Sequence, residues 1–434
     1  MSEMPPGTAL PPASDGPPAP PVEVVDASGS PDQAGSRIRD FTLRAVVPVL
    51  AVFTAFLVGA LIIIFSDPET LKLFTTDPVA AIQRAIGQVI DAYTALITGA
   101  LGSPAEYVAA FASGDPEQIK AAFVPISETI LNATPLIFTG LSVALGFRSG
   151  LFNIGAEGQL YVGAIFATFV GFAITGLPIF IHLPLAIAAG FLGGALWGFI
   201  PGILKARTGA HEVIVTIMLN YTSYLLLAWV LKTSVFQREG RDDPISKIIQ
   251  DSAVFPQFVN DSTLRANFST LLALAAALGV SWLLFRSVRG FEFRAVGLNP
   301  GAARYAGMSI SRTIVLTMII CGGLAGLAGT QQVLGPARTL TPGFSPGWGF
   351  DGIAVALIGG SRPLGVVLAA FLFGALRAGA TPMQAATGIP IDLVVVIQAL
   401  VIMFVAAPRL IREIYRIRVP ETTGTEILAQ GWKS

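Results

Sequence analysis

The sequence predicts an all-α, polytopic membrane protein with about ten transmembrane helices. Apolar stretches long enough to cross a bilayer follow one another between Arg44 and Pro408, and 53% of the residues are hydrophobic while only 12% are charged. One soluble core cannot bury so much apolar surface, so this surface must face lipid as well as protein. Basic and acidic residues are equal in number, 27 of each, so no net charge favours a nucleic-acid partner.

The chain begins with a segment, 1–36, that is rich in Pro, Ser, Gly and Asp and has few large apolar residues. Such a segment cannot bury enough surface to offset the entropy of ordering, so we predict a disordered, Pro-rich cytoplasmic tail. It is not a signal peptide, because the first apolar run starts only after Arg44 and no small-residue cleavage pattern follows it. The transmembrane domain is predicted at 37–418, and a cytoplasmic C-terminal tail at 419–434.

Each crossing requires roughly 17 to 25 predominantly apolar residues. In chain order the sequence offers eight clear spans, at 45–65, 125–147, 151–175, 180–204, 211–231, 268–285, 313–334 and 391–407. Arginines before the first span and after the last place both termini in the cytoplasm by the positive-inside rule, so the number of crossings must be even. The apolar stretch 344–379 therefore contributes two crossings, a short glycine-interrupted one at about 345–360 and a return at 364–378.

This topology assigns the loops to two sides. The cytoplasmic loops carry Arg148, Lys205, Arg207, Arg286, Arg289, Arg294, Arg304 and Arg312. The segments 66–124 and 232–267 are mixed in charge and are predicted to be extracytoplasmic. Within the first of them, 79–90 has apolar positions at helical spacing, which favours a helix that lies along the membrane surface, seats a partner protein or merely covers the spans.

Two polar, glycine-rich runs interrupt the apolar pattern. They are Gly-Leu-Phe-Asn-Ile-Gly-Ala-Glu-Gly-Gln at 150–159 and Gly-Phe-Ser-Pro-Gly-Trp-Gly-Phe-Asp-Gly at 343–352. Each precedes an apolar run and then a similar small-residue segment, so they are predicted to be copies of an inverted repeat, one starting inside and one outside. Interrupted helices in such repeats indicate a transport pathway, because freed backbone groups are tolerated only where they line a cavity or meet protein. Close helix packing is the alternative explanation for the glycines alone.

Glu157 and Asp351 occupy matching positions in the two copies and are candidates for the substrate pathway. A carboxylate within a span costs roughly 2.5 to 3.5 kcal/mol on insertion scales, and such residues usually face a polar interior. The alternative is that each acid caps the N-terminus of a short half-helix. The other pathway candidates at comparable depth are Asn153, Gln159, Asn220, Trp348 and Phe350. These residues add polar or aromatic groups to the spans, although Trp348 could equally belong to an interfacial belt.

The sequence argues against an enzyme or a metal site. Cys321 is the single cysteine, and His182 and His211 have no metal-ligand spacing. There is no serine or cysteine nucleophile elbow. The sequence also has no Gly-x-x-x-x-Gly-Lys-Ser/Thr run, so the phosphate cradle for ATP hydrolysis must come from another chain. We therefore expect no catalytic residue, no metal and no cofactor bound by this chain.

The cytoplasmic loop 286–312 contains the signal of a short, capped helix. An N-cap residue, a proline at the first helical position, helix formers and a glycine able to adopt the left-handed conformation follow one another. These residues are Asn299, Pro300, Ala302, Ala303, Arg304, Tyr305 and Gly307. Such a helix is suited to a groove on another protein, and an ordinary connecting turn is the alternative.

The run 294–307, Arg-Ala-Val-Gly-Leu-Asn-Pro-Gly-Ala-Ala-Arg-Tyr-Ala-Gly, resembles the coupling-helix segment of binding-protein-dependent ABC import permeases. The branch is the one that includes ribose, branched-chain amino acid and nucleoside importers. Three further runs, 150–159, 212–220 and 349–360, resemble its nucleoside or simple-sugar permeases. These motifs occur in the same order as in those permeases, and the resemblance covers about 43–408.

The resemblance implies a transport subunit of a bacterial plasma-membrane importer, with 37–418 as its permease domain. It implies a second related permease, a cytosolic ABC ATPase that uses ATP, and an extracytoplasmic substrate-binding protein or lipoprotein that delivers the small-molecule solute. ATPase closure would push the 299–307 helix and drive alternating access. The residues alone also fit an ion-coupled secondary transporter in which Glu157 and Asp351 bind protons or sodium.

Overall fold

The structure, a computed structural model, describes residues 32–416 except 260 and 262. The chain divides into two units, Met1–Ala45 and Val46–Ser434, and the description below concerns the second. The predicted tails at 1–36 and 419–434 lie outside the described residues, apart from the first turn of helix α1 (Asp32–Ser66). Between 32 and 416, the described residues form helices, loops and two isolated β-bridges, which confirms the predicted all-α class.

Eight helices in the described part of the chain are long and apolar enough to cross a membrane. They are the Val46–Ser66 part of α1, α5 (Pro116–Arg148), α6 (Ala156–Ala173), α7 (Ile179–Thr208), α8 (Glu212–Val230), α9 (Ser269–Arg286), α12 (Ile310–Gln332) with the π-helix Val333–Ala337 that follows it, and α14 (Pro363–Thr387). Each coincides with one predicted span, so the chain is a polytopic membrane protein.

Two bent helix pairs also reach the length of a span. One pair, α15 (Asp392–Ala406) and α16 (Pro408–Ile414), bends by 88° and coincides with the predicted span at 391–407. The other pair, α3 (Pro78–Leu101) and α4 (Pro104–Ser113), bends by 46° and lies in the segment 66–124. Length and composition thus allow up to ten spans among the described residues. The extracytoplasmic assignment of 66–124 stays a prediction.

The predicted crossing at 345–360 is a half-helix in the structure. Helix α13 (Trp348–Ile358) has 11 residues, and at 1.5 Å per residue it is about 16 Å long, roughly half of the hydrocarbon core. It therefore cannot cross the membrane alone. The loop that leads into it starts after the π-helix at Arg338, which has the left-handed conformation with φ of 53°.

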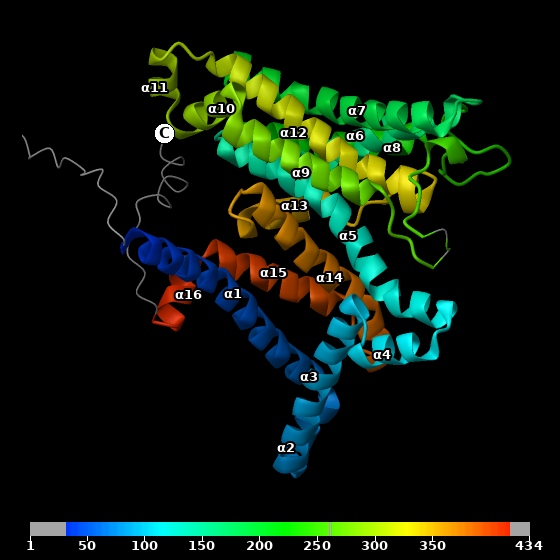
Figure 1. Cartoon of the computed structure of the whole chain (residues 1–434), viewed down its shortest axis with the longest axis vertical. Helices are drawn as coiled ribbons and strands as arrows, with labels where there is room; N and C mark the ends of the chain where they lie inside the picture. Colours follow the sequence, from blue (N-terminus) through cyan, green and yellow to red (C-terminus); the bar gives the residue numbers. More distant parts are fainter. Residues whose placement is uncertain (1–31, 260, 262, 417–434) are drawn as a thin grey trace, which may run out of the picture. The chain divides into compact units, whose positions relative to one another are not determined.

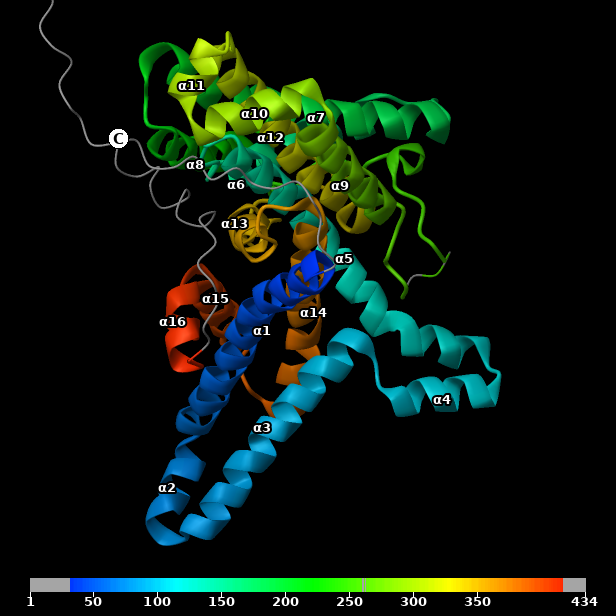
Figure 2. The same ribbon diagram turned by 60° about the vertical axis from the view of Figure 1, so that its left-hand side comes forward.

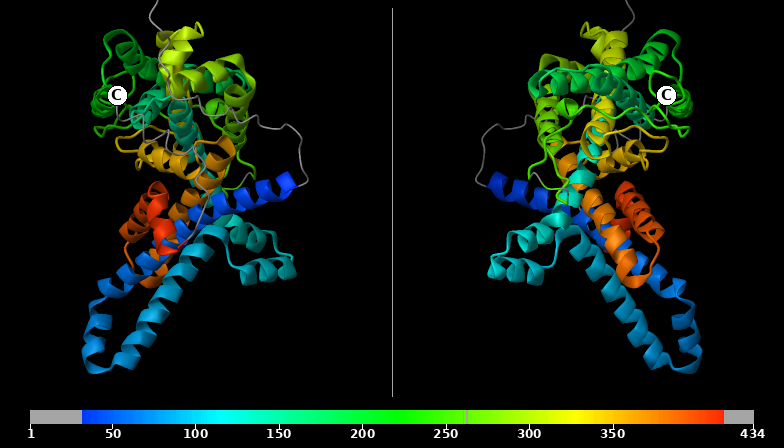
Figure 3. Two further views of the ribbon diagram at one scale, coloured as in Figure 1. Left: turned by 90° about the vertical axis from the view of Figure 1, so that its left-hand side faces the viewer. Right: turned by 90° about the vertical axis from the view of Figure 1, so that its right-hand side faces the viewer.

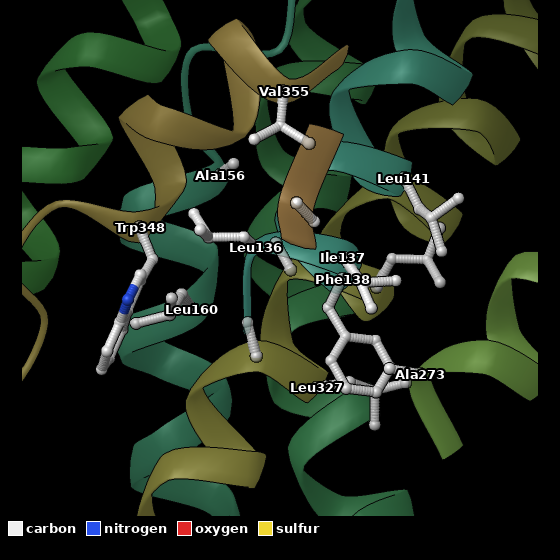
Figure 4. Packing of buried hydrophobic residues seen from close by; sticks show 14 of the residues in the cluster. Leu136, Ile137, Phe138, Leu141, Ala156, Leu160, Ala273, Leu327, Trp348 and Val355 are labelled. Carbon is white, nitrogen blue, oxygen red and sulfur yellow. The ribbon is translucent and has the colours of Figure 1, made fainter. Parts of the chain in front are cut away.

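Helix α5 lies at the centre of the second unit. In its most apolar window 83% of the residues are buried, whereas in α8 the share is 28%. Figure 4 shows the core from close by, where Phe138 of α5 lies beside Ala273 of α9 and Leu327 of α12. Within the second unit, Figure 1 shows α6, α7, α8, α9 and α12 as one group of helices and the Val46–Ser66 part of α1 with α3, α14 and α15 as another, with α5 between them.

The second group has its own small core, to which α1, α3, α14 and α15 contribute Ile63, Leu96, Leu376 and Ile397. The short helix α2 (Pro68–Thr76) joins α1 to α3. Figures 2 and 3 show α2 at the tip of a hairpin that α1 and α3 form. Asp67 caps α2 and forms a 3.1 Å ion pair with Arg84 of α3. Hydrogen bonds from Thr70, Gln88 and Arg84 hold the pKa of the Asp67 carboxyl well below its usual range.

Glycines bring the backbones of α6, α7 and α12 close together. A Cβ atom on Gly326 of α12 would lie 2.5 Å from the carbonyl oxygen of Gly190 in α7. A Cβ atom on Gly163 of α6 would overlap Gly326 itself. Small residues let membrane helices approach at this distance. The packing explanation therefore accounts for these glycines, although it does not account for the breaks before α6 and α13.

Gly326→Ala is expected to destabilise the chain. The methyl group would meet backbone atoms of α7 that cannot rotate away, and such overpacking costs about 1 to 3 kcal/mol. The matched control is Gly279→Ala in α9, where no atom lies within 4 Å of an added Cβ. Thermal unfolding of the detergent-solubilised variants is the measurement. Equal melting temperatures for the two variants would contradict the close approach of α7 and α12.

Candidate functional site

Glu157 joins the two broken helices. It is the second residue of α6, is 1% exposed, and accepts the backbone N–H of Gly349 in the first turn of α13 at 2.6 Å. The hydroxyl oxygen of Ser345 accepts the N–H groups of Gly347 and Trp348 at 3.2 and 3.3 Å. Free N–H groups carry the positive end of the helix dipole, so the start of α13 stabilises the buried carboxylate. Glu157 thus caps the helix of the other copy, whereas the sequence analysis considered a cap on its own helix.

The two broken helices run in opposite directions from this contact. Near the far end of α6, the Gly171 carbonyl accepts the N–H of Gln250 in the loop 232–267 at 2.9 Å. Beyond the end of α13, the Ser361 carbonyl accepts Nε of Arg148 at 3.0 Å. One half-helix therefore leads to the loop predicted outside and the other to the arginines predicted inside. This is the arrangement that an inverted repeat with broken helices produces.

Asp351, the fourth residue of α13, does not cap a helix. Its carboxylate forms an ion pair with Arg377 of α14, and the two side chains are 23% and 19% exposed. Arg377 also donates a 3.4 Å hydrogen bond to the carbonyl of Pro346. Arg377 was not among the residues predicted from the sequence, although it is the only basic residue in the predicted span 364–378. An ionisable residue within a span is by default a functional candidate, and that signal could have identified it.

The three candidate amides lie in one buried hydrogen-bond network and are at most 2% exposed. Asn153 and Gln159 exchange hydrogen bonds of 2.8 and 3.1 Å. Asn220 of α8 donates to the carbonyl of Ile154 at 3.0 Å and accepts the N–H of Gly158 at 2.8 Å. These bonds fix the turn between α5 and α6 beside Glu157. A solute would have to replace them, and the pathway role of the three amides stays a prediction.

The two candidate aromatic residues differ in exposure. Trp348 is 5% exposed and lies beside Leu160 in Figure 4, and its indole N–H has no hydrogen-bond partner among the described residues. Phe350 is 44% exposed. The burial of Trp348 weakens its assignment to an interfacial belt, because belt residues sit at the headgroup level with their polar ends in water.

A cluster of aromatic rings lies next to Glu157, and the sequence analysis missed it. The ring centre of Tyr161 is 4.7 Å from that of Tyr224 in α8 and 4.8 Å from that of Phe344. Tyr161 stands four residues after Glu157, on the same face of α6. That spacing could have connected the acid and the ring from the sequence. The junction of α6 and α13 therefore combines a carboxylate, an ion pair, amides and aromatic rings.

The predicted short helix in the loop 286–312 is present as α11 (Pro300–Tyr305), which follows α10 (Val288–Leu298). The side chain of Asn299 accepts the N–H of Ala302 at 3.0 Å, and Gly307 has φ of 81°, as the sequence predicts. Tyr305 is 97% exposed. Figure 1 shows α10 and α11 at one end of the α6–α9 and α12 group, with the loop 232–267 at the other.

The end of α10 touches the turn that carries the site. A Cβ atom on Gly297 would lie 2.6 Å from the carbonyl oxygen of Arg148 and 2.7 Å from the amide nitrogen of Gly150. Gly150 opens the turn that leads to α6 and Glu157, and Gly297 precedes the cap of α11 by two residues. A displacement of α11 can therefore reach the junction through direct backbone contact. Among the described residues, no group of three or more His, Cys, Asp or Glu side chains could hold a metal ion.

Comparison with known proteins identifies relatives of this chain. It is 44% identical over 288 residues to the guanosine ABC transporter permease protein NupP of Bacillus subtilis, covering 66% of this chain and 82% of NupP. It is 34% identical over 374 residues to the nucleoside ABC transporter permease protein NupB of Lactococcus lactis, covering 84% and 91%. It is 32% identical over 306 residues to the glucose ABC transporter permease protein TsgB13 of Haloferax volcanii, covering 68% and 79%.

The same B. subtilis and L. lactis strains each contain a second, more distant match, the permease proteins NupQ and NupC. No solved structure matches the chain. Residues 126–406, which include the junction of α6 and α13 and the helix α11, match the family described as "Branched-chain amino acid transport system / permease component". The chain belongs to this family of membrane permease components.

Proposed function

We propose that this chain is a permease subunit of an ATP-binding-cassette importer that carries nucleosides or simple sugars into the cell, with nucleosides the first class to test. The observation that carries the proposal is the 44% identity to NupP, whose name states guanosine as its solute. NupB supports nucleosides as well, and TsgB13 supports sugars. The broken helices that diverge from Glu157 supply the kind of membrane-embedded site in which transporters bind solutes.

The proposed machine contains three further components. A second permease is supported by the pairs NupP with NupQ and NupB with NupC, each pair from one bacterium. A cytosolic ATPase is required because the sequence lacks the glycine-rich phosphate loop of an ATP-hydrolysing domain. An extracytoplasmic binding protein completes the importer. The location is the bacterial inner membrane, with both termini in the cytoplasm.

The proposed coupling route starts at α11. Closure of the ATPase would displace α11, and Gly297 would pass the motion to the backbone at Gly150. This backbone leads through the amide network to Glu157 and its bond with Gly349. Separation of α6 from α13 would then open the pathway to one side. Alternating access thus depends on an interhelical contact that can break and form again.

The alternative is an ion-coupled transporter that uses Glu157 and Asp351. Both carboxylates already have partners, since Glu157 accepts a backbone N–H and Asp351 pairs with Arg377. A coupling ion would have to compete with these partners. The comparisons, whose named relatives are ABC transporter permease proteins, favour ATP as the energy source.

The proposal is tested in proteoliposomes that contain the chain with its ATPase, second permease and binding protein. We expect uptake of labelled guanosine only when ATP is present on the ATPase side, and weaker or no uptake of labelled glucose. Uptake that follows a proton or sodium gradient without ATP would favour the ion-coupled alternative. ATP-driven uptake of glucose but not of guanosine would instead assign the chain to the sugar permeases.

Arg304→Glu is expected to reduce ATP-driven uptake by about tenfold or more, because a charge reversal at a docking interface costs at least about 1.4 kcal/mol. Arg304 lies in the last turn of α11 and has no ion-pair partner among the described residues. The control is Arg207→Glu, at the exposed end of α7. Uptake and solute-stimulated ATPase activity are measured at matched membrane levels. Unchanged values in the Arg304 variant would exclude α11 as the coupling helix.

A further inference from the structure

Three arginines converge at the end of the helices where α10 and α11 lie. The guanidinium carbons of Arg148 and Arg294 are 5.9 and 5.6 Å from the ring centre of Phe285, in the last turn of α9. Arg362, the residue before α14, directly follows Ser361, whose carbonyl accepts the Nε–H of Arg148 at 3.0 Å. These three residues, called the arginine cluster below, come from three separate parts of the chain.

The arginine cluster has no acidic partner in the part of the chain that the structure describes. Among the described residues, no carboxylate lies within ion-pair distance of its three members. Acids on nearby loops already have partners, since Glu212 pairs with Lys205 at 2.5 Å and Glu292 pairs with Arg289 at 2.8 Å. Like charges brought together repel one another unless an anion lies between them. The positive-inside rule explains arginines at the ends of spans, but it does not require three of them to meet.

Arg148 is held in place within the cluster. Its Nε donates to the carbonyl of Ser361 at 3.0 Å and its Nη2 donates to that of Gly360 at 3.2 Å. Arg294 makes only a 3.4 Å hydrogen bond to the carbonyl of Gly290. Guanidinium groups have five N–H donors, so several donors of the cluster remain available for a ligand. Their planar fork geometry matches the oxygens of a phosphate group.

An exposed apolar face of α9 leads to the cluster. Leu271, Leu278, Trp282 and Phe285 are 50%, 74%, 63% and 42% exposed. Their spacing of seven, four and three residues places them on one face of the helix. The face extends for about 21 Å at 1.5 Å per residue, which is comparable to an acyl chain with its glycerol linkage. Its last member, Phe285, is the ring over which Arg148 and Arg294 lie.

We propose that the arginine cluster binds the phosphate group of an anionic phospholipid whose acyl chain lies along the exposed face of α9. The site combines what such a lipid requires, an exposed apolar stripe within a span and guanidinium groups at its end. Basic pockets between transmembrane helices on the cytoplasmic side bind anionic headgroups in the same way. Carboxylates of the ATPase are the less favoured ligand, because the cluster lies at the last turn of a span while α11 extends beyond it. The proposal does not depend on which solute is transported.

The test uses the purified full chain in detergent with phosphatidylglycerol or phosphatidylcholine and measures retained lipid by native mass spectrometry. We expect the wild-type chain to retain phosphatidylglycerol in preference. The double variant Arg148→Gln/Arg294→Gln is expected to bind it about tenfold more weakly, because it removes two charged donors of hydrogen bonds to the phosphate. Arg207→Gln is the matched control, because it removes an exposed arginine at the same end but outside the cluster.

Equal retention of the two lipids, or equal retention by the double variant and the wild type, would overturn the proposal. Competition by millimolar inorganic phosphate, with no preference for the lipid, would show a site for free phosphate instead. Loss of the ATPase during co-purification, with lipid retention unchanged, would assign the cluster to the ATPase interface. If the double variant does not fold, Arg294→Gln and Arg362→Gln decide the question, since neither removes the contacts of Arg148 with Ser361 and Gly360.

Discussion

Arg377→Met is expected to lower the yield and the melting temperature of the folded chain more than any other single change considered. The change leaves Asp351 within the transmembrane helices with no ion-pair partner among the described residues. Removing one member of a buried pair costs about 3 to 5 kcal/mol. Because the side chains of the pair are 23% and 19% exposed, we expect the lower end of that range. Size-exclusion chromatography and thermal unfolding in detergent measure the effect.

The double variant Arg377→Met/Asp351→Leu separates the ion pair from other contributions of Arg377. Replacing both charges with apolar side chains is often neutral, so most of the lost stability should return. A double variant as unstable as Arg377→Met would mean that packing, or the bond to the Pro346 carbonyl, matters more than the pair. A stable double variant that no longer supports uptake would favour the predicted pathway role of Asp351.

Helix α14 ends later in the chain than the predicted span 364–378. The predicted span 364–378 stopped near Arg377, because a charged residue normally ends an apolar stretch. Helix α14 continues to Thr387, where Gly388 ends it in the left-handed conformation, and Arg377 within the helix pairs with Asp351. At the N-terminal end of α5, a helix-capping signal that hydropathy does not detect sets the first residue of the helix. The helix begins at Pro116 rather than 125 because Asp115 caps it and accepts the N–H of Glu117.

The acids and amides of the site were predicted from the sequence, whereas Arg377, the aromatic cluster and the contacts among these residues were not. The polar runs identified Glu157 and Asp351 because acids within apolar spans are costly wherever they occur. Their partners depend on the folded structure, since Glu157 and Gly349 are 192 residues apart in the chain. Local spacing can place residues on one helix face, but it cannot show which two helix ends meet. For this reason the sequence analysis considered two similar caps, and the structure contains one cap between copies and one ion pair.

Glu157→Ala is expected to weaken the junction of α6 and α13. The variant loses the 2.6 Å hydrogen bond to the N–H of Gly349 and leaves that group buried without its acceptor. Hydrogen bonds to charged groups contribute about 1.5 to 3 kcal/mol, so the melting temperature and the yield of folded chain should fall. Thermal unfolding in detergent measures the change. A variant as stable as the wild type would contradict the role of Glu157 as a cap on α13.

Glu157→Gln is the matched control, because its amide oxygen can still accept the N–H of Gly349 while the charge is lost. If capping is the whole role of Glu157, this variant should fold and transport nearly as well as the wild type. If the charge acts in the pathway, it should fold normally and lose uptake in proteoliposomes. Since Tyr161 stands one turn after Glu157 on the same face of α6, normal folding without uptake would favour a pathway role for the carboxylate at this junction. Unfolding of both variants would instead show that the junction requires the negative charge itself, as expected if the dipole of α13 stabilises it.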